Sequence, residues 1–195
     1  ERPAQTEGSF FTARYEELPP DAPRDDSITR LMVSLDRRVN QHNRELFADW
    51  VPEPAPEGAP SYVGSGACES CHAEAFAWWR GHPHGNAYAT LEERHKNFNL
   101  SCVGCHVTGY LRPGGSTVTH VENLEDVGCE SCHGPSSVHV RTEATSDVVR
   151  SPEEHACRVC HTPDHSDRFH FETYRRLLIV PGHGAPAVNA VSGER

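Results

Sequence analysis

Apolar residues recur at every third or fourth position between residues 27 and 47, and this spacing predicts one amphipathic helix. Ser27 is a residue type that favours the N-cap of a helix. His42 falls on the same face as the apolar side chains. That face comprises Ile28, Leu31, Met32, Leu35, Val39 and Leu46.

Elsewhere the pattern predicts only short elements. Helices are expected at 73–80 and at 171–180, and Pro181 followed by Gly182 ends the second one. A Pro-rich stretch at 52–56 is expected to be extended. We therefore divide the chain into a Pro-rich N-terminal arm, residues 1–60, which docks or contacts another subunit through its helix, and a body, residues 61–195.

The composition does not suit a conventional core. Only 36% of the residues are apolar, and 15 glycines and 15 prolines are spread through 195 residues. Such a chain cannot bury enough aliphatic surface to offset the entropy of folding. We expect a mostly α-helical fold with much irregular coil, in which other apolar material fills the interior.

The cysteines indicate what that material is. All eight occur in CxxC pairs, and a histidine follows each pair directly, which is the pattern of c-type haem attachment. The thiols form thioethers to the porphyrin, and the histidine becomes an iron ligand. The four motifs are Cys68, Cys71 and His72; Cys102, Cys105 and His106; Cys129, Cys132 and His133; and Cys157, Cys160 and His161.

Two other interpretations of the cysteines compete with haem attachment. Four CxxC pairs can make two zinc ribbons, and an even number of cysteines suits a disulfide scaffold. Neither explains the histidines, because chance would place one after all four pairs in roughly three of a hundred thousand cases. We therefore predict four covalently attached haem c groups, packed closely together as the core.

Charge and hydropathy narrow the choice of partners. The formal net charge is −10, and Lys96 is the only lysine. No basic run offers a surface for nucleic acid, and no stretch is long and apolar enough for a membrane span. We expect redox protein partners, preferably basic ones, or extracellular acceptors.

The motifs resemble those of the tetrahaem cytochrome c-554 family. The resemblance covers about residues 61–184 and is most specific around the third haem. It rests on 67–72 (ACESCH) with Trp79 and 84–87 (HGNA), on 102–110 (CVGCHVTGY), on 128–135 (GCESCHGP) with His139, and on His183. It implies a mostly helical multihaem fold, electron transfer as the activity, and three distal iron ligands. These are His139 opposite His72, His84 opposite His133, and His183 opposite His161.

The resemblance names no distal ligand for the second haem, on His106. In the founding family member the corresponding iron is open, but this chain adds an arm that carries His42. His42 is therefore the first candidate, followed by His120 and then by His82 and His95. Because Met32 is the only methionine, bis-histidine ligation is expected in general.

These predictions favour electron transfer over catalysis, and no catalytic residue is identified. Similar tetrahaem cytochromes polymerise into extracellular filaments in which the arm of one subunit supplies a histidine to the next, and we expect a homopolymer of this kind. The alternatives are a soluble periplasmic carrier, or an enzyme that acts on small nitrogen or sulfur species at an open His106 haem. The chain begins at Glu1, and we expect an extracytoplasmic protein, extracellular or periplasmic, after signal-peptide removal.

Overall fold

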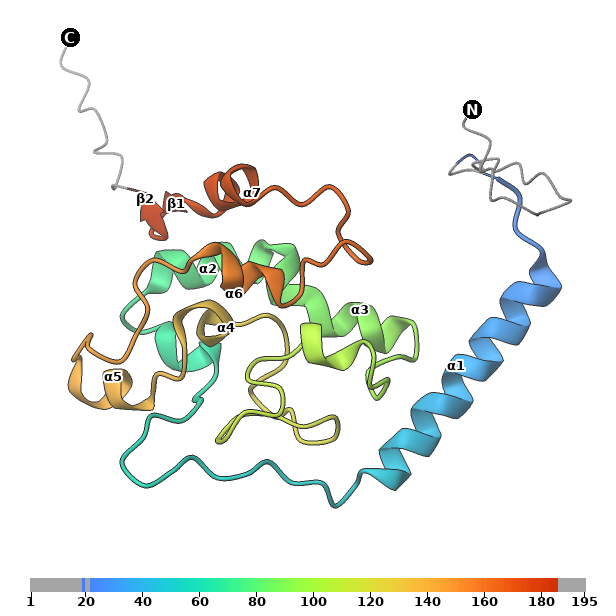
Figure 1. Cartoon of the computed structure of the whole chain (residues 1–195), viewed down its shortest axis with the longest axis horizontal. Helices are drawn as coiled ribbons and strands as arrows, with labels where there is room; N and C mark the ends of the chain where they lie inside the picture. Colours follow the sequence, from blue (N-terminus) through green and yellow to red (C-terminus); the bar gives the residue numbers. More distant parts are fainter. Residues whose placement is uncertain (1–18, 20–21, 186–195) are drawn as a thin grey trace, which may run out of the picture.

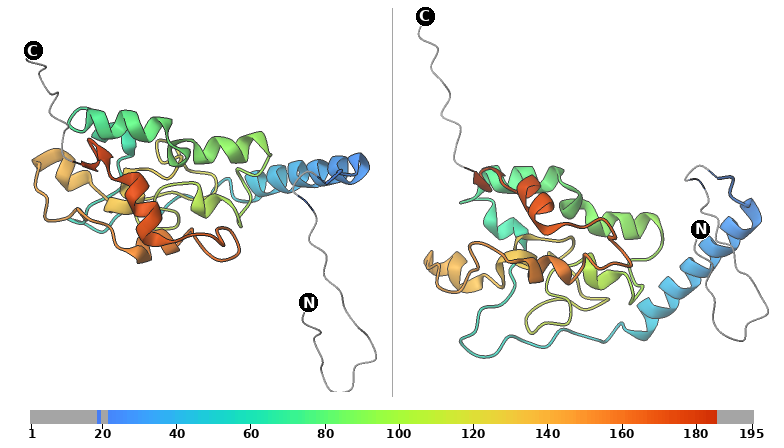
Figure 2. Two further views of the ribbon diagram at one scale, coloured as in Figure 1. Left: turned by 90° about the horizontal axis from the view of Figure 1, so that it is seen from above. Right: turned by 45° about the horizontal axis from the view of Figure 1, so that its top comes forward.

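The computed structural model describes residue 19 and residues 22–185, and its longest helix is α1, Asp26–Leu46. Asp25 caps this helix, because its carboxylate accepts the backbone N–H groups of Ser27 at 2.7 Å and Ile28 at 3.1 Å. The predicted helix is confirmed, but the expected cap, Ser27, lies inside it. No residue of α1 is buried, and the helix extends away from the body (Figures 1 and 2).

The body consists of short helices joined by coil, as expected from the composition. Its α-helices are α2 (Ala73–Gly81), α3 (Ala87–Glu93), α4 (Cys129–His133), α5 (Ser137–Thr142), α6 (Glu154–Arg158) and α7 (Phe171–Leu178). Three turns of 3-10 helix are η1 (Ser65–Cys68), η2 (Pro83–Asn86) and η3 (Val103–Cys105). The predictions at 73–80 and 171–180 correspond to α2 and α7.

Strand structure in the described part of the chain is confined to two short strands near its C-terminal end. They are β1 (Val180–Pro181) and β2 (Gly184–Ala185), which pair in parallel with Val180 opposite Gly184. They lie close to α2 and α7 (Figure 1). Among these same residues no helix is both long and apolar enough to cross a membrane.

The buried apolar core is small. Tyr88, Val103, Val107 and Val118 form one cluster beside the second CxxCH motif. By contrast, many large apolar side chains are exposed, including Leu31, at 64% of its surface. The protein's own side chains therefore supply only part of the apolar interior that a chain of this length needs.

An extended segment joins α1 to the body. The Thr119 hydroxyl donates a hydrogen bond to the Phe47 carbonyl at 2.6 Å, and the Thr117 hydroxyl donates to the Trp50 carbonyl at 2.7 Å. Further on, the Gly114 N–H donates to the Glu53 carbonyl at 2.6 Å. The part of the arm that follows α1 thus runs along the body, and the division at residue 60 stays a prediction.

Candidate functional site

Each CxxCH motif sits on a single helical turn. The first motif begins at Cys68, the last residue of η1, and the second motif contains η3. The third motif is α4, and the fourth begins in α6. The His72 N–H donates to the Cys68 carbonyl at 2.9 Å, and the His161 N–H donates to the Cys157 carbonyl at the same distance. One turn places residues i, i+3 and i+4 on one side, so both thiols and the imidazole of a motif can meet one ligand.

Most of the predicted iron ligands hold their rings by a hydrogen bond from Nδ1. A carbonyl oxygen can only accept, so the proton lies on Nδ1 and the lone pair on Nε2, as metal ligation requires. Four rings bond in this way to backbone carbonyls, and His161 bonds to the Ser166 hydroxyl at 3.0 Å. The four are His106 to Ala87 at 2.6 Å, His133 to Val149 at 2.6 Å, His139 to Ala144 at 2.9 Å and His183 to Leu178 at 2.7 Å.

Six of the predicted ligands face one another in pairs. Imidazole nitrogens bind metals at roughly 2 Å, so an iron between two Nε2 atoms separates the ring centroids by about 6 Å. Three histidine pairs have this spacing, and the residues therefore fit bis-histidine haem. They are His72 with His139 at 6.2 Å, His84 with His161 at 6.2 Å, and His133 with His183 at 6.1 Å.

Two of these pairs differ from the arrangement that the resemblance implied. His84 was expected opposite His133 and His183 opposite His161, whereas the structure exchanges these partners. The chain returns after α7 so that β1 contacts α2, and His183, which follows β1, lies beside His133 of the third motif. Only His139 lies opposite the expected ring, that of His72.

His84 has no hydrogen bond from Nδ1, but its protonation is biased by its surroundings. Burial, with smaller contributions from His82 and His161, lowers the pKa of His84 to about 4. The imidazole is therefore neutral at pH 7, which is the form that binds metals.

His106 differs from the other three motif histidines. Within residue 19 and residues 22–185, no aromatic ring faces its imidazole at the bis-histidine spacing. His42 is exposed on α1. His120 bonds through Nδ1 to Thr119 at 3.2 Å, and His82 accepts the His84 N–H at 3.2 Å. None of these candidates, nor His95, is brought opposite His106 within the chain.

The eight cysteines are unbridged, and sulfur hydrogen bonds join the first motif to the third and the second to the fourth. The thiol of Cys68 hydrogen-bonds to Cys129, which lowers the pKa of Cys129 to about 6. Cys105 likewise hydrogen-bonds to Cys160. The described residues contain no group of three or more metal-binding side chains, so the structure gives no support to zinc ribbons.

Glu130, inside the third motif, was missed in the sequence. Only 2% of its surface is exposed, and its carboxylate accepts the N–H groups of Val63 at 3.0 Å, Gly64 at 2.7 Å and Ser136 at 2.8 Å. Burial raises the pKa of Glu130, and these hydrogen bonds oppose the rise. The carboxylate thus ties the third motif to the segment that precedes the first. The identical CESCH sequence around the exposed Glu69 gave no sign of this difference.

Comparisons with known proteins agree with the motifs. The family model "Cytochrome c554 and c-prime" matches residues 67–134, which contain three of the four attachment motifs. Cytochrome c-554 of Nitrosomonas europaea is 33% identical over 90 residues, which cover 38% of this chain and 38% of that protein. No solved structure matches the chain. Residues 67–134 are therefore similar to the cytochrome c-554 family, and the matched segment spans well under two thirds of that relative's length.

Proposed function

We propose that the chain binds four haem c groups through its eight cysteines and transfers electrons between redox partners. The likeness of residues 67–134 to a cytochrome c family implies covalently bound haem. Haem iron supplies reversible one-electron chemistry when bound. The observation that carries the proposal is the set of three histidine pairs at bis-histidine spacing, each containing one motif histidine.

The protein's side chains orient and tune these ligands. Hydrogen bonds from Nδ1 to carbonyls fix the tautomer and the rotation of a ring, and they raise its basicity as a ligand. Two imidazoles on one iron leave no position for a substrate. Three of the four sites are therefore suited to electron transfer and not to catalysis.

We further propose that α1 docks on a second copy of the chain and that His42 ligates the neighbour's His106 haem. Asp36, Asn40 and Asn43 form the face of α1 that contacts the body, through Lys96, Asn97 and Phe98. His42 lies about 160° from Asn40 and about 100° from Asn43 around the helix. It is exposed and lies outside the face that contacts the body.

The other faces of α1 support this docking. Ile28, Leu31, Met32 and Leu35 are 51–64% exposed and form an apolar stripe that includes His42. A stripe of this length is typical of a helix that packs on another surface. The stripe therefore lacks cover within the described residues of one chain, and a second copy would supply it.

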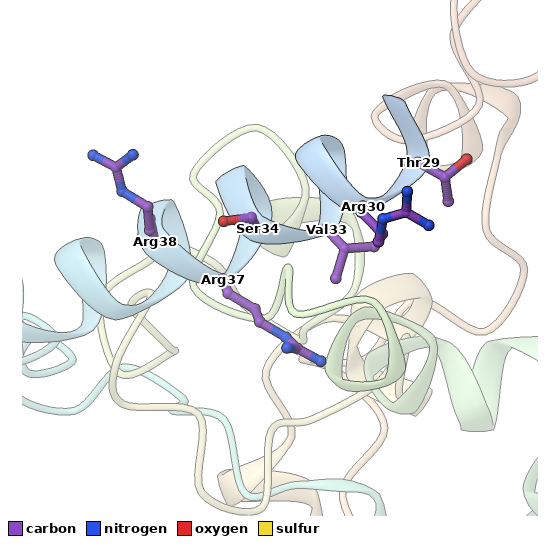
Figure 3. Close-up of a pocket in the computed structure, with 6 residues that line it drawn as sticks. All are labelled: Thr29, Arg30, Val33, Ser34, Arg37 and Arg38. Atoms are coloured by element: carbon purple, nitrogen blue, oxygen red, sulfur yellow. The ribbon is translucent and has the colours of Figure 1, made fainter. Parts of the chain in front are cut away.

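Charge favours a second copy as the occupant. Figure 3 shows Arg30, Arg37 and Arg38 projecting from α1 around a pocket that also includes Val33. With Arg44, the helix carries four arginines against three acidic residues, whereas the whole chain has a net charge of −10. The arginine-bearing face of this helix is attracted to an acidic body of the same protein. Repeated contacts of this heterologous kind give an open filament.

A single-chain carrier and an enzyme with an open His106 iron are the alternatives. The observation that favours the enzyme is that no ring lies opposite His106 within the described residues. The filament proposal depends on this same observation. In either case we place the protein outside the cytoplasm, where haem is attached to CxxCH motifs, and expect basic redox partners for its acidic surface.

The haem count tests the proposal. The protein, purified from a host that attaches haem c, should carry four haems per chain by intact mass and by the pyridine haemochrome spectrum. The double variant Cys157→Ser/Cys160→Ser should carry three, because serine cannot form the thioether bonds. The fourth motif is the one to test, since it lies outside the segment that matches the family. Three haems in both proteins would refute the four-haem proposal.

A further inference from the structure

Four aromatic rings form a continuous row between two of the ligand pairs. Trp78 of α2 stacks on His183, with centroids 5.3 Å apart at 20°, and on His82 at 4.5 Å and 27°. His82 in turn meets His84 edge to face at 4.9 Å. The two ends of the row, His84 and His183, are the distal candidates for two different haems, on His161 and His133.

The backbone beside His183 packs closely against α2, the helix that carries Trp78. Gly182 has φ +77°, and a Cβ at this position would collide with the Cβ of Glu74. Only glycine allows both this conformation and this approach. The His183 hydrogen bond to the Leu178 carbonyl fixes one direction of the ring. The indole of Trp78 fixes its plane.

His82 is itself a support and not a ligand in this arrangement. Its Nδ1 accepts the His84 N–H at 3.2 Å, so the proton of the neutral ring is on Nε2, the atom that would otherwise bind iron. Its carbonyl also accepts from Gly85 at 3.0 Å and from Asn86 at 3.1 Å. His82 is thus fixed to η2 and presents its ring to both Trp78 and His84.

We infer that Trp78 is a positioning residue that holds the distal ligands of two haems at once. It acts directly on His183 and, through His82, on His84. The inference rests on the proposed haem ligation. Because His183 has one hydrogen bond and one stacking partner, removal of the indole leaves its ring free to tilt away from the iron. The haem on His133 then becomes open to an external ligand.

Carbon monoxide binding by the reduced protein measures such an opening. We expect the natural protein to bind at most one molecule per chain, at the His106 haem. Trp78→Leu should bind at least one more, at the haem on His133, whereas Trp78→Phe, which keeps an aromatic face, should stay close to the natural protein. Trp50→Leu is the matched control, because it makes the same change at a tryptophan that packs on Phe47, with centroids 5.4 Å apart, and does not join the row.

The haem count separates this inference from the proposed function. If Trp78→Leu retains four haems and gains no carbon monoxide site, or if Trp50→Leu gains the same site, Trp78 has no positioning role. If the natural protein carries fewer than four haems, the proposed function fails instead. If Trp78→Leu does not fold, Trp78→Phe and Trp78→Tyr decide the question, because both retain an aromatic face and must keep the natural low-spin spectrum. A high-spin band in both aromatic variants would overturn the inference.

Discussion

The imidazoles of His72 and His139 face each other with their centroids 6.2 Å apart, although the residues are far apart in the sequence. His72 belongs to the first CxxCH motif, and His139 lies on α5, just after the third. The Cys68 and Cys129 sulfurs of these two motifs also hydrogen-bond. The first and third CxxCH motifs are therefore neighbours, and each depends on the segment that carries the other.

His139→Ala should open the iron on His72. We expect one additional carbon monoxide per chain in the reduced protein and a high-spin band in the oxidised spectrum, because no other ring faces His72 within the described residues. His155→Ala is the control, since the His155 side chain is 82% exposed and meets only Glu153. An unchanged spectrum in His139→Ala would remove His139 from the ligand set.

Glu130→Gln should destabilise the protein, because an amide cannot accept all the backbone N–H groups that the carboxylate satisfies. Loss of hydrogen bonds to a buried group costs about 1–3 kcal/mol. Glu69→Gln changes the same position of an identical motif at an exposed site and should have little effect. Denaturant unfolding of the two variants gives the comparison, and equal midpoints would contradict the role of Glu130.

Gly182→Ala should displace His183, because the added methyl group meets Glu74 and the backbone at φ +77° is strained for alanine. We expect an additional carbon monoxide site on the reduced protein. Gly58 has a nearly identical φ of +79°, and a Cβ added there would have nothing within 4 Å. Gly58→Ala therefore shares the backbone strain and lacks the clash, and it should keep the natural ligation. Unchanged carbon monoxide binding in Gly182→Ala would show that the turn at Gly182 does not determine the position of His183.

His42→Ala should shorten or abolish polymers if the helix bridges two copies. Negative-stain electron microscopy of the natively purified protein measures polymer length, and Gln41→Ala is the control on the same helix, since Gln41 is exposed and bonds only to Glu45. Long filaments from both variants would refute the bridge. Compact particles from the natural protein would favour a carrier formed by one chain.

Local patterns predicted much of this molecule. The spacing of Leu31, Leu35 and their neighbours predicted α1. The attachment residues named from the CxxCH motifs stay a prediction. The N-cap shifted from Ser27 to Asp25, because both types cap well and the spacing does not distinguish them. Short elements such as α3 and α5 are too brief for a periodic pattern and were not predicted.

The partners of the distal histidines could not be read from local sequence. Which ring faces His133 depends on the return of the chain over α2, where Gly182 and Trp78 seat the turn that carries His183. The buried state of Glu130 likewise depends on Gly64, a residue 66 positions away. Such long-range packing has no signature in a motif of five residues.

Near-infrared magnetic circular dichroism of the oxidised protein tests the central claim most directly, because it counts low-spin haems by ligand type. With four haems per chain from the haemochrome spectrum, we predict bis-histidine ligation for at least three of them. The fourth should also be bis-histidine in polymers and should be high-spin in isolated chains if His42 is its ligand. Fewer than three bis-histidine haems would contradict the ligand pairs on which the account rests.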